Sequence, residues 1–498
     1  MGEILLEEIL KELEKKENIR TNLSTLRAQI KDSVKKSKLM WQISDYEELF
    51  LGFLKNEDAK TRKNAALLLG DVAYEPAKRA LYDAYMAETT RFVKASYLQA
   101  LAELDVTELL PDLRDALDQL LETELEPENK KHIEEEIRAL RKIMIQNEGI
   151  NRHTLDVKGK KVSVILLTNR LQKETVRRSI DCGTAELHPL GVFVETEHLK
   201  KLMQLRTYRD MVFPLRMEGF LPAEPADAAK GLVDAQIIEV LDSLHKEGGE
   251  YYFRIEVKGT MDLEARSAFT KKLSGELERL SKGRLVNSTS DYEVEIRLIT
   301  NKDGLFFPCL KLATVKSNRF AYRKNTIATS IHPSSAALMM ELAKDYLKAH
   351  AQILDPFCGV GTMLIERHKQ VVAKEIYGID IFGDAIISAR ENTELAGIRV
   401  NYIHRDFFDF KHDYKFDEIV TNMPPRGKKT KQEMDAFYRD FFEKSKEILA
   451  KEAVIIMYTN EIAFVKKQLR LQKEFTLLQE TCMQPKNDFY LFVLGYKA

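Results

Sequence analysis

A glycine-containing loop between a predicted strand and a predicted helix constrains the fold of this chain more than any other feature. The sequence ILDPFCGVGT (353–362) ends an apolar run in an acid and a proline, then places two glycines one residue apart. The residues that follow, MLIERHKQ, have helical spacing. Glycines let a ligand approach the backbone, and the start of a helix offers unpaired N–H groups. The pattern predicts an α/β domain with a ligand at this loop.

The spacing of the loop excludes two common phosphate-binding motifs. Leu364 stands where the dinucleotide fingerprint G-x-G-x-x-G requires a third glycine, and no Gly-Lys-Ser/Thr follows, as a Walker loop requires. A loop that begins with Asp and keeps only G-x-G suits a ligand without a pyrophosphate. S-adenosylmethionine is such a ligand, since it offers an amino-acid end and a ribose.

Three later strands end in residues that suit the same ligand. The strand EIYGID (375–380) ends in Asp380, which is placed to accept hydrogen bonds from two ribose hydroxyls. VNYIHRD (400–406) ends in Asp406, which suits an exocyclic amine of adenine, and FDEIVTNMPPRG (416–427) ends in a polar residue and two prolines. Open α/β sheets bind ligands at the carboxyl ends of their strands. The order of these residues therefore supports S-adenosylmethionine as the cofactor.

The 498 residues are too many for one core, and about three domains are expected. Strand and helix alternate from about residue 328 to the end, which predicts an α/β domain. Residues 155–310 mix short β-like runs with helical segments, which predicts an α+β region, and EPADAAK (224–230) is interpreted as a linker inside it.

Residues 1–145 have helical spacing throughout. The segment at 56–73 is followed about 32 residues later by a similar one at 92–104, so that Arg62 aligns with Lys94 and Leu69 with Leu101. A helical pattern that repeats at this distance predicts a small solenoid of paired helices. An unrelated helical bundle is the alternative.

Composition limits the remaining possibilities. Cys182, Cys309, Cys358 and Cys482 are scattered without a C-x-x-C pair, which argues against disulfides and a zinc site and favours a cytoplasmic location. No apolar run reaches the length of a membrane span, and the amino terminus is unlike a signal peptide. We therefore expect neither a metal nor a membrane partner.

The overall charge of −1 hides an uneven distribution. Residues 1–150 contain 23 Lys and Arg against 30 Asp and Glu, whereas residues 301–350 contain 8 against 3. A basic segment in a nearly neutral chain predicts local contact with a polyanion.

The motifs DPFCGVGTMLIE and TNMPP resemble those of the RNA guanine-N2 methyltransferases that carry a THUMP domain. The segment RFAYRKNTIATSIHPSSAALMMELA (319–343) is similar to the stretch before the catalytic domain of that family, and the helices at 56–104 resemble HEAT repeats. The resemblance implies a HEAT-like helical region at 1–148, a ferredoxin-like and THUMP-like RNA-binding region at 155–315, and a Rossmann-like class I methyltransferase domain at 319–498. It covers about 155–498 and leaves out the amino-terminal helices.

The resemblance also implies roles for individual residues. Cofactor binding is assigned to Asp355, Phe357, Cys358, Gly359, Gly361, Thr362, Asp380 and Asp406. Catalysis is assigned to the loop residues Asn422, Pro424, Pro425 and Arg426. The family has an aromatic residue after its catalytic proline, whereas this chain has Arg426 after Pro425. A guanidinium can also stack on a base, so Arg426 is the candidate replacement, with contact to phosphate as the alternative.

RNA needs contacts outside the pocket, and two basic segments flank the predicted site. No acidic residue lies between Asp303 and Glu341, and Phe320 and Tyr322 are interleaved with the basic residues there. Basic residues beside aromatic ones suit phosphates and unstacked bases. The predicted RNA-binding residues are Lys311, Lys316, Arg319, Arg323, Lys324, Lys428 and Lys429.

The sequence leaves several functions open. Methylation of guanine N2 in tRNA is the leading hypothesis, with rRNA as another possible substrate and adenine N6 as an alternative acceptor, because Asn-Pro-Pro loops serve both amines. DNA is less favoured. A non-catalytic RNA-binding module is a third hypothesis, because the aromatic residue is missing. The amino-terminal helices, which carry net negative charge, suit a protein partner.

Overall fold

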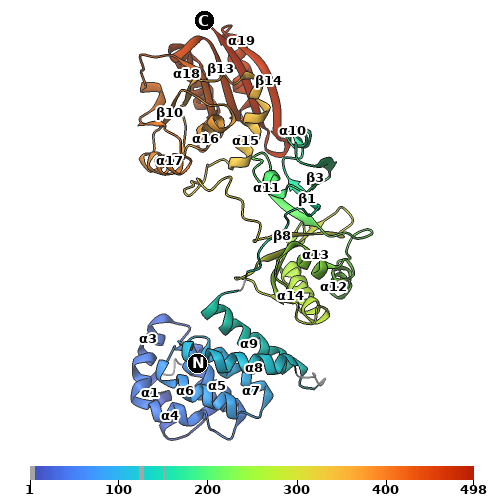
Figure 1. Ribbon diagram of the computed structural model, residues 1–498. Coiled ribbons are helices and arrows are strands. Elements are labelled where there is room, and N and C mark those ends of the chain that lie inside the picture. The colour runs from blue at the N-terminus through green and yellow to red at the C-terminus, as the bar shows by residue number, and fades with distance from the viewer. Residues whose placement is uncertain (1–5, 123–127, 151) are drawn as a thin grey trace. The chain divides into compact units, whose positions relative to one another are not determined.

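The computed structural model describes residues 6–122, 128–150 and 152–498 (Figure 1). The chain divides into two compact units, Met1–Asn151 and Arg152–Ala498. The first unit contains the region 1–148, whose predicted bounds stay a prediction and of which residues 1–5 and 123–127 lie outside the described residues.

Helices and short turns make up the described part of the first unit. The helices are α1 (Leu6–Glu14), α2 (Ile19–Gln29), α3 (Ser33–Gln42), α4 (Glu47–Phe53), α5 (Ala59–Asp71), α6 (Lys78–Ala87), α7 (Arg91–Leu101), α8 (Leu110–Glu122) and α9 (Lys130–Glu148). α4 packs on α5, α6 on α7 and α8 on α9, while α5 contacts α7 and α7 contacts α9. Leu69 and Leu101, aligned by the repeat, are both fully buried. Helices are thus paired and the pairs are stacked, and the HEAT-like assignment stays a prediction.

A buried ion pair joins two successive helix pairs. Arg62 of α5 donates from Nε and Nη2 to the carboxylate of Glu88, both at 2.8 Å, and Tyr97 of α7 donates its hydroxyl to the same carboxylate at 3.2 Å. Burial acts against ionisation of Glu88, but the hydrogen bonds from Arg62 and Thr90 hold its pKa at about 2. The predicted repeat position of Arg62 therefore links neighbouring pairs, through Glu88.

The second unit begins with a β-α-β-β-α-β segment. Its elements are β1 (Val162–Leu167), α10 (Lys173–Arg178), β2 (Thr184–His188), β3 (Gly191–Thr196), α11 (Leu199–Leu202) and β4 (Asp210–Pro214). The strands lie in the order β2-β3-β1-β4, and all three pairings are antiparallel. This is the arrangement of a ferredoxin-like unit.

The sheet continues into a second segment through the antiparallel pair of β4 and β8. The elements of this segment are α12 (Pro225–Asp234), α13 (Ile237–Leu244), β5 (Tyr251–Lys258), α14 (Leu263–Leu280), β6 (Leu285–Asn287), β7 (Val294–Thr300) and β8 (Phe306–Leu312). The segment corresponds in position to the predicted THUMP-like half, which stays a prediction.

The interpretation of 224–230 as a linker is wrong, because these residues begin helix α12. The side chain of Glu224 caps the helix by accepting the N–H of Asp227 at 3.0 Å, and Pro225 occupies the first turn, where its missing N–H costs nothing. Ala228 and Ala229 are fully buried against the core. The polar residues and the proline, which in the sequence are typical of a linker, therefore form the amino-terminal end of a helix.

The remaining residues build an α/β domain around a seven-stranded sheet. Its elements are α15 (Pro333–Leu342), β9 (Gln352–Asp355), α16 (Thr362–Gln370), β10 (Glu375–Asp380), α17 (Gly383–Leu395), β11 (Asn401–His404), β12 (Phe416–Asn422), α18 (Lys431–Ile448), β13 (Leu449–Thr459), α19 (Ile462–Leu471), β14 (Phe475–Gln484) and β15 (Phe489–Lys497). The strand order is β11-β10-β9-β12-β13-β15-β14, with β15 antiparallel to β13. Among the described residues, no helix combines the length and apolar content that a bilayer span needs.

Candidate functional site

The four polar strand-end residues predicted from the sequence lie along one edge of the sheet. Asp355, Asp380 and Asn422 are the last residues of β9, β10 and β12, and Asp406 follows β11 by two residues. These strands are parallel neighbours in the order β11-β10-β9-β12. The chain order reverses between β9 and β12, which is where open α/β sheets bind ligands.

The glycine loop is tied to the end of the neighbouring strand. Gly359 and Gly361 have φ angles of 51° and 81°, a region that side-chain-bearing residues rarely adopt. A Cβ atom on Gly361 would lie 2.3 Å from the hydroxyl of Tyr402, so no other residue fits there. The N–H of Gly359 donates to Oδ2 of Asp380 at 2.8 Å. The loop and Asp380 thus form one site.

Further side chains at this site fit a nucleoside that carries an amino-acid end. Oδ1 of Asp380 accepts the N–H of Phe382 at 2.9 Å, which fixes the carboxylate and leaves lone pairs for hydroxyl groups. Ile381 and Phe382, beside it, are 56% and 65% exposed and suit the flat face of a purine. The buried hydroxyl of Thr362 has no hydrogen-bond partner among the described residues, so a ligand would satisfy it.

Cys358 supports the loop from inside, and its predicted contact with the cofactor stays a prediction. Its side chain is buried against Ile353, Leu364 and Tyr402, and burial raises the pKa of its thiol. Its N–H donates to the carbonyl of Ile379 at 2.9 Å. The side chain and the backbone N–H of Cys358 therefore both contact other parts of the fold.

Asp355 carries a buried carboxyl group at the end of the central strand. Burial raises its pKa to about 7, and a hydrogen bond from the N–H of Phe357 at 3.1 Å opposes this shift. The folded protein therefore keeps a proton on Asp355 between about pH 4 and 7, where the unfolded chain loses it. This contribution to stability is present at low pH and is lost as the pH rises through 7.

Replacing Asp355 with asparagine, which mimics the protonated acid, should flatten the pH dependence of stability. Wild type should lose about 2 kcal/mol relative to Asp355→Asn between about pH 5.5 and 7, because each unit of pKa corresponds to about 1.4 kcal/mol. Thermal melting of both proteins across this range measures the difference. A constant gap between the two melting curves would mean that Asp355 is ionised throughout.

The loop after β12 is held at both of its ends. The N–H of Met423 donates to the carbonyl of Tyr458 at 3.0 Å, which fixes the backbone beside Asn422. Arg426 donates from Nε to the carbonyl of Lys429 at 3.0 Å. Pro425 and Arg426 are exposed, while Asn422 and Pro424 are half-buried. The structure thus brings the four predicted catalytic residues together beside the glycine loop, although one guanidinium N–H of Arg426 already closes the turn.

Phe437 is a residue of this site that the sequence alone did not indicate. The Nζ of Lys429 lies 4.6 Å from the centroid of its ring, and Phe357 and Phe408 pack on the same ring at centroid distances of 5.5 and 5.6 Å. Phe437 belongs to α18, outside both motifs, so only the fold places it between them. It connects the glycine loop, through Phe357, to the loop after β12.

Asn392 of α17 is a second such residue. It is fully buried, and its amide Nδ2 donates to the carbonyl oxygens of Val360 and Asn325, each at 3.1 Å. Its Oδ1 accepts the N–H of Asn325 at 3.1 Å. Asn392 therefore fastens the segment before the α/β domain to the glycine loop. An asparagine in the middle of a helix was its only signal in the sequence.

Arg319 does not offer the free guanidinium that phosphate binding requires, which corrects its predicted role. It donates to the carbonyl oxygens of Leu205 and Arg209 at 2.8 and 3.0 Å and lies 3.5 Å from the ring centroid of Tyr208. Burial lowers its pKa. Arg319 joins the ferredoxin-like segment to the α/β domain.

A buried carboxylate completes this junction. Glu366 of α16 accepts Nε and Nη2 of Arg206 at 2.8 and 2.6 Å and the hydroxyl of Tyr322 at 2.5 Å. Because α16 begins at the glycine loop, these bonds fix the ferredoxin-like segment relative to the candidate site.

The other predicted RNA-binding residues divide into two groups. Lys311 pairs with Asp210 at 2.9 Å and is therefore engaged within the protein. Arg323 is half-buried, with its Nη2 at 3.5 Å from the carbonyl of Ile331, but its Nε has no hydrogen-bond partner among the described residues, so its role stays a prediction. The others are exposed at the surface: Lys316, Lys324, Lys428 and Lys429. These four remain candidates for phosphate contact.

Comparisons with known proteins agree with this architecture. Residues 321–483 match the family UPF0020, described as an RMKL-like methyltransferase domain. The solved structure of TrmN from Thermus thermophilus shares the fold with a TM-score of 0.51 and 18% identity, over 68% of this chain and 99% of that one.

Two archaeal relatives are similar in sequence. A protein of Methanothermobacter thermautotrophicus is 34% identical over 132 residues (26% of this chain and 38% of the relative), and one of Pyrococcus abyssi is 34% identical over 110 residues (21% and 31%). Both are named tRNA (guanine(10)-N2)-dimethyltransferase. The chain thus spans about a third of the length of these relatives. Residues 321–483 therefore match the RMKL-like methyltransferase domain, a class I fold whose cofactor is S-adenosylmethionine, and parts of the chain are similar in sequence to the two archaeal relatives.

Proposed function

We propose that this protein transfers a methyl group to the exocyclic N2 amine of a guanosine in RNA, with tRNA as the favoured substrate. The observation that carries the proposal is the position of Asn422 and Pro424 at the end of β12, next to β9 and its glycine loop. The names of the two archaeal relatives support the choice of tRNA and of the guanine amine.

The residues of the β12 loop suit an amine acceptor. The side-chain oxygen of Asn422 and a backbone carbonyl near Pro424 would accept the two N–H bonds of the amine. This draws the nitrogen toward tetrahedral geometry and aims its lone pair at the methyl group. The cofactor supplies an electrophilic methyl group, so the protein's contribution is alignment, for which about 7–11 kcal/mol is available. Arg426 would contact the face of the flipped base.

Methyl transfer from labelled S-adenosylmethionine to bulk tRNA and to rRNA, followed by nucleoside digestion, tests the proposal. We expect label in N2-methylguanosine from tRNA. Label in N6-methyladenosine would contradict the choice of amine, and label from rRNA alone would contradict the choice of RNA. The absence of label in any nucleoside would favour a non-catalytic RNA-binding module.

Replacing Asp380 with alanine should weaken binding of S-adenosylmethionine by about 1–3 kcal/mol, because charge-assisted hydrogen bonds to the ribose and the tie to Gly359 are lost. Isothermal titration calorimetry measures the affinity. The matched control is Asp384→Ala, an exposed aspartate in the first turn of α17, which should bind normally. Unchanged affinity in Asp380→Ala would mean that the cofactor lies elsewhere.

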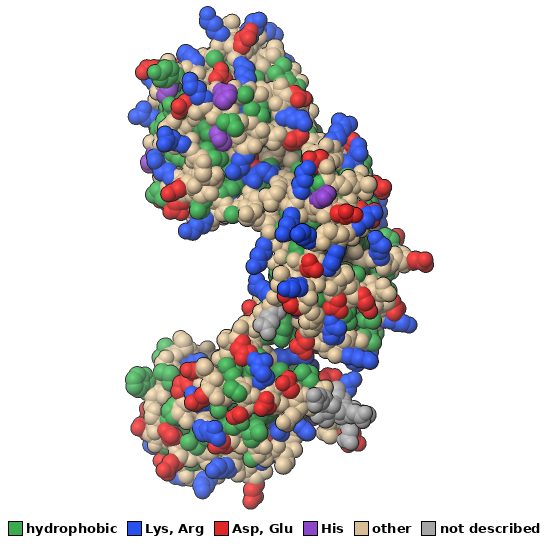
Figure 2. All heavy atoms as spheres, viewed as in Figure 1, with side chains coloured by type: hydrophobic (Ala, Val, Ile, Leu, Met, Phe, Trp, Pro, Cys, Tyr) green, Lys and Arg blue, Asp and Glu red, His purple; other side chains and the backbone are tan. Residues whose placement is uncertain are grey.

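A basic concavity in the sheet region suits the RNA backbone. It has a volume of about 460 Å³, and none of its lining residues is acidic. Arg152, Lys200 and Lys316 line it and are exposed. Lys and Arg side chains are also frequent on the visible surface of this region (Figure 2). Three cations around a hollow without acids favour phosphate groups.

Replacing Lys200 and Lys316 together with alanine should weaken RNA binding with little sequence preference. The slope of log affinity against log salt should fall by about 1–2, because each phosphate contact releases counterions. Filter binding across a salt series measures the slope. Lys271→Ala with Lys272→Ala, two exposed lysines of α14 outside the concavity, is the control and should keep the wild-type slope. Equal slopes in all three proteins would exclude the concavity from the interface.

A further inference from the structure

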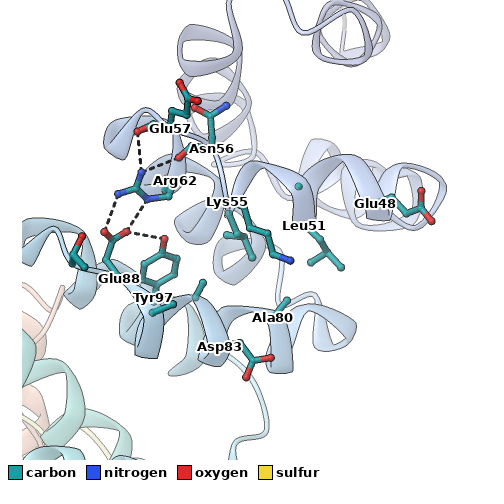
Figure 3. A pocket seen from close by; sticks show the side chains of 15 residues that line it. Glu48, Leu51, Lys55, Asn56, Glu57, Arg62, Ala80, Asp83, Glu88 and Tyr97 are labelled. Atoms are coloured by element: carbon teal, nitrogen blue, oxygen red, sulfur yellow. Dashed lines mark hydrogen bonds and ion pairs between the residues drawn. The ribbon is translucent and has the colours of Figure 1, made fainter.

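A wide concavity lies in the amino-terminal unit. It has a volume of about 910 Å³ and is lined by α4, α6 and the residues around Arg62 and Glu88 (Figure 3). This volume falls within the range of binding sites for ligands and peptide segments. None of the roles assigned above uses it.

Two sides of the concavity are formed by α4 with the turn that follows it, and by α6. On one side, Glu48, Leu51, Gly52 and Lys55 are spaced i, i+3, i+4 and i+7, and Ala80, Asp83, Ala84 and Ala87 repeat this spacing on α6. Figure 3 shows Leu51 and Lys55 on the side of α4, across from Ala80 and Asp83. Gly52, Ala80, Ala84 and Ala87 have small side chains or none, so these parts of the walls leave a groove that an occupant with large apolar side chains would fill.

Gly52 supports this interpretation. A glycine inside a helix costs about 0.5–1 kcal/mol relative to alanine. A Cβ atom at Gly52 would meet no atom within 4 Å, and its φ angle is not in the positive range, so nothing within the described structure requires glycine. At Gly70, by contrast, a Cβ would lie 2.5 Å from Cα of Ala100. Close approach of a partner to α4 would explain the glycine at 52.

The charges of the groove favour a basic occupant. Arg62 and Glu88 neutralise each other at one end, where Tyr97 also binds Glu88. The remaining charged lining residues are Glu48, Glu57 and Asp83 against Lys55. Among the described residues, Asp83 forms an exposed i,i+4 ion pair with Arg79 at 3.1 Å, and such exposed pairs are weak. Net negative charge therefore surrounds an apolar groove.

We propose that the groove between α4 and α6 binds an amphipathic helical segment of a partner protein, which inserts large apolar side chains between the helices and places basic residues against the acidic rim. This corresponds to the helix-in-groove mode of peptide recognition, in which residues at i, i+3, i+4 and i+7 act as anchors. The proposal is independent of the methyl-transfer reaction.

A binding experiment with the full-length chain tests the proposal. The probe is a fluorescent synthetic helical peptide of about 16 residues, with leucines at i, i+3, i+4 and i+7 and lysines on both flanks, and a second peptide carries glutamates in place of the lysines. Fluorescence anisotropy should show at least about tenfold tighter binding of the lysine peptide. Ala84→Arg should weaken that binding at least about tenfold by filling the groove. Glu48→Lys with Asp83→Lys should reverse the preference between the two peptides.

Ala116→Arg is the matched control, because Ala116 is also a half-buried alanine of this unit but lies on α8, outside the groove. It should bind the lysine peptide within about twofold of wild type. Equal binding of both peptides, or full binding by Ala84→Arg, would overturn the proposal. The molecular mass of wild type and of Ala84→Arg should also be measured at rising protein concentration. If the mass doubles in wild type but not in Ala84→Arg, the occupant is a second copy of the chain and the proposal is overturned.

Discussion

Replacing Asn422 with alanine should lower turnover by about a hundredfold or more while leaving the affinity for S-adenosylmethionine nearly unchanged. Asn422 is the last residue of β12, and its backbone pairs with Tyr458 of β13. Its position is therefore fixed before substrate binds. Its hydrogen bond to the acceptor amine would strengthen only as the nitrogen becomes tetrahedral in the transition state. Such an interaction lowers the barrier to methyl transfer without strengthening substrate binding in the ground state. A hundredfold loss corresponds to about 2.7 kcal/mol.

Single-turnover rates with saturating RNA, together with calorimetry of the cofactor, measure the two effects separately. The control is Asn401→Ala, which replaces an exposed asparagine at the opposite, amino-terminal end of β11 and should react at the wild-type rate. Parallel losses of cofactor affinity and rate in Asn422→Ala would show that Asn422 supports the fold of the loop and not the reaction.

Replacing Arg367 with alanine should destabilise the methyltransferase domain by about 3–5 kcal/mol. Arg367 of α16 and Glu418 of β12 are both fully buried, and Nε of Arg367 donates to Glu418 at 2.7 Å. Arg367 also donates to the carbonyl oxygens of Lys348 and Val371. Removing it leaves Glu418 as an uncompensated buried charge, which costs far more than the net value of an intact pair.

Urea unfolding followed by circular dichroism measures this effect. Arg439→Ala is the control, because the side chain of Arg439 is 59% exposed and pairs with the exposed Asp440, so its loss should cost about 0–1 kcal/mol. A change below about 1 kcal/mol in Arg367→Ala would show that water or a rearranged neighbour compensates the carboxylate of Glu418.

The segment that ends in Asp355 and the segment that ends in Asn422 show what local sequence predicts well. Each of these strands can be recognised because its apolar run is followed within a few residues by a distinctive sequence. For Asp355 this is an acid and a glycine loop, and for Asn422 it is Asn-Met-Pro-Pro. The parallel order of β9, β10, β11 and β12 then follows from the α/β alternation, which brings their carboxyl ends to one edge. The methyltransferase domain and its cofactor were therefore predictable.

The basic residues before this domain show where local sequence was insufficient. Arg319 and Lys316 are three residues apart in the same basic stretch, yet Arg319 binds two carbonyl oxygens and the ring of Tyr208, whereas Lys316 is exposed. Charge is a property of the residue, but its availability depends on what other segments bring beside it. Arg319 meets Leu205 and Arg209 more than a hundred positions away.

By itself, the sequence determined which residue types line the strand ends, where a glycine loop lets a ligand approach the backbone, and that the amino-terminal helices carry net negative charge. Only the tertiary structure decided that Phe437 joins the two site loops, that Asn392 fastens the glycine loop to Asn325, and that α4 and α6 leave a groove between them. The physical reason is distance along the chain. Propensity, periodicity and turn chemistry act between near neighbours, whereas these contacts form between elements that meet only when the apolar faces of the helices and sheets pack together.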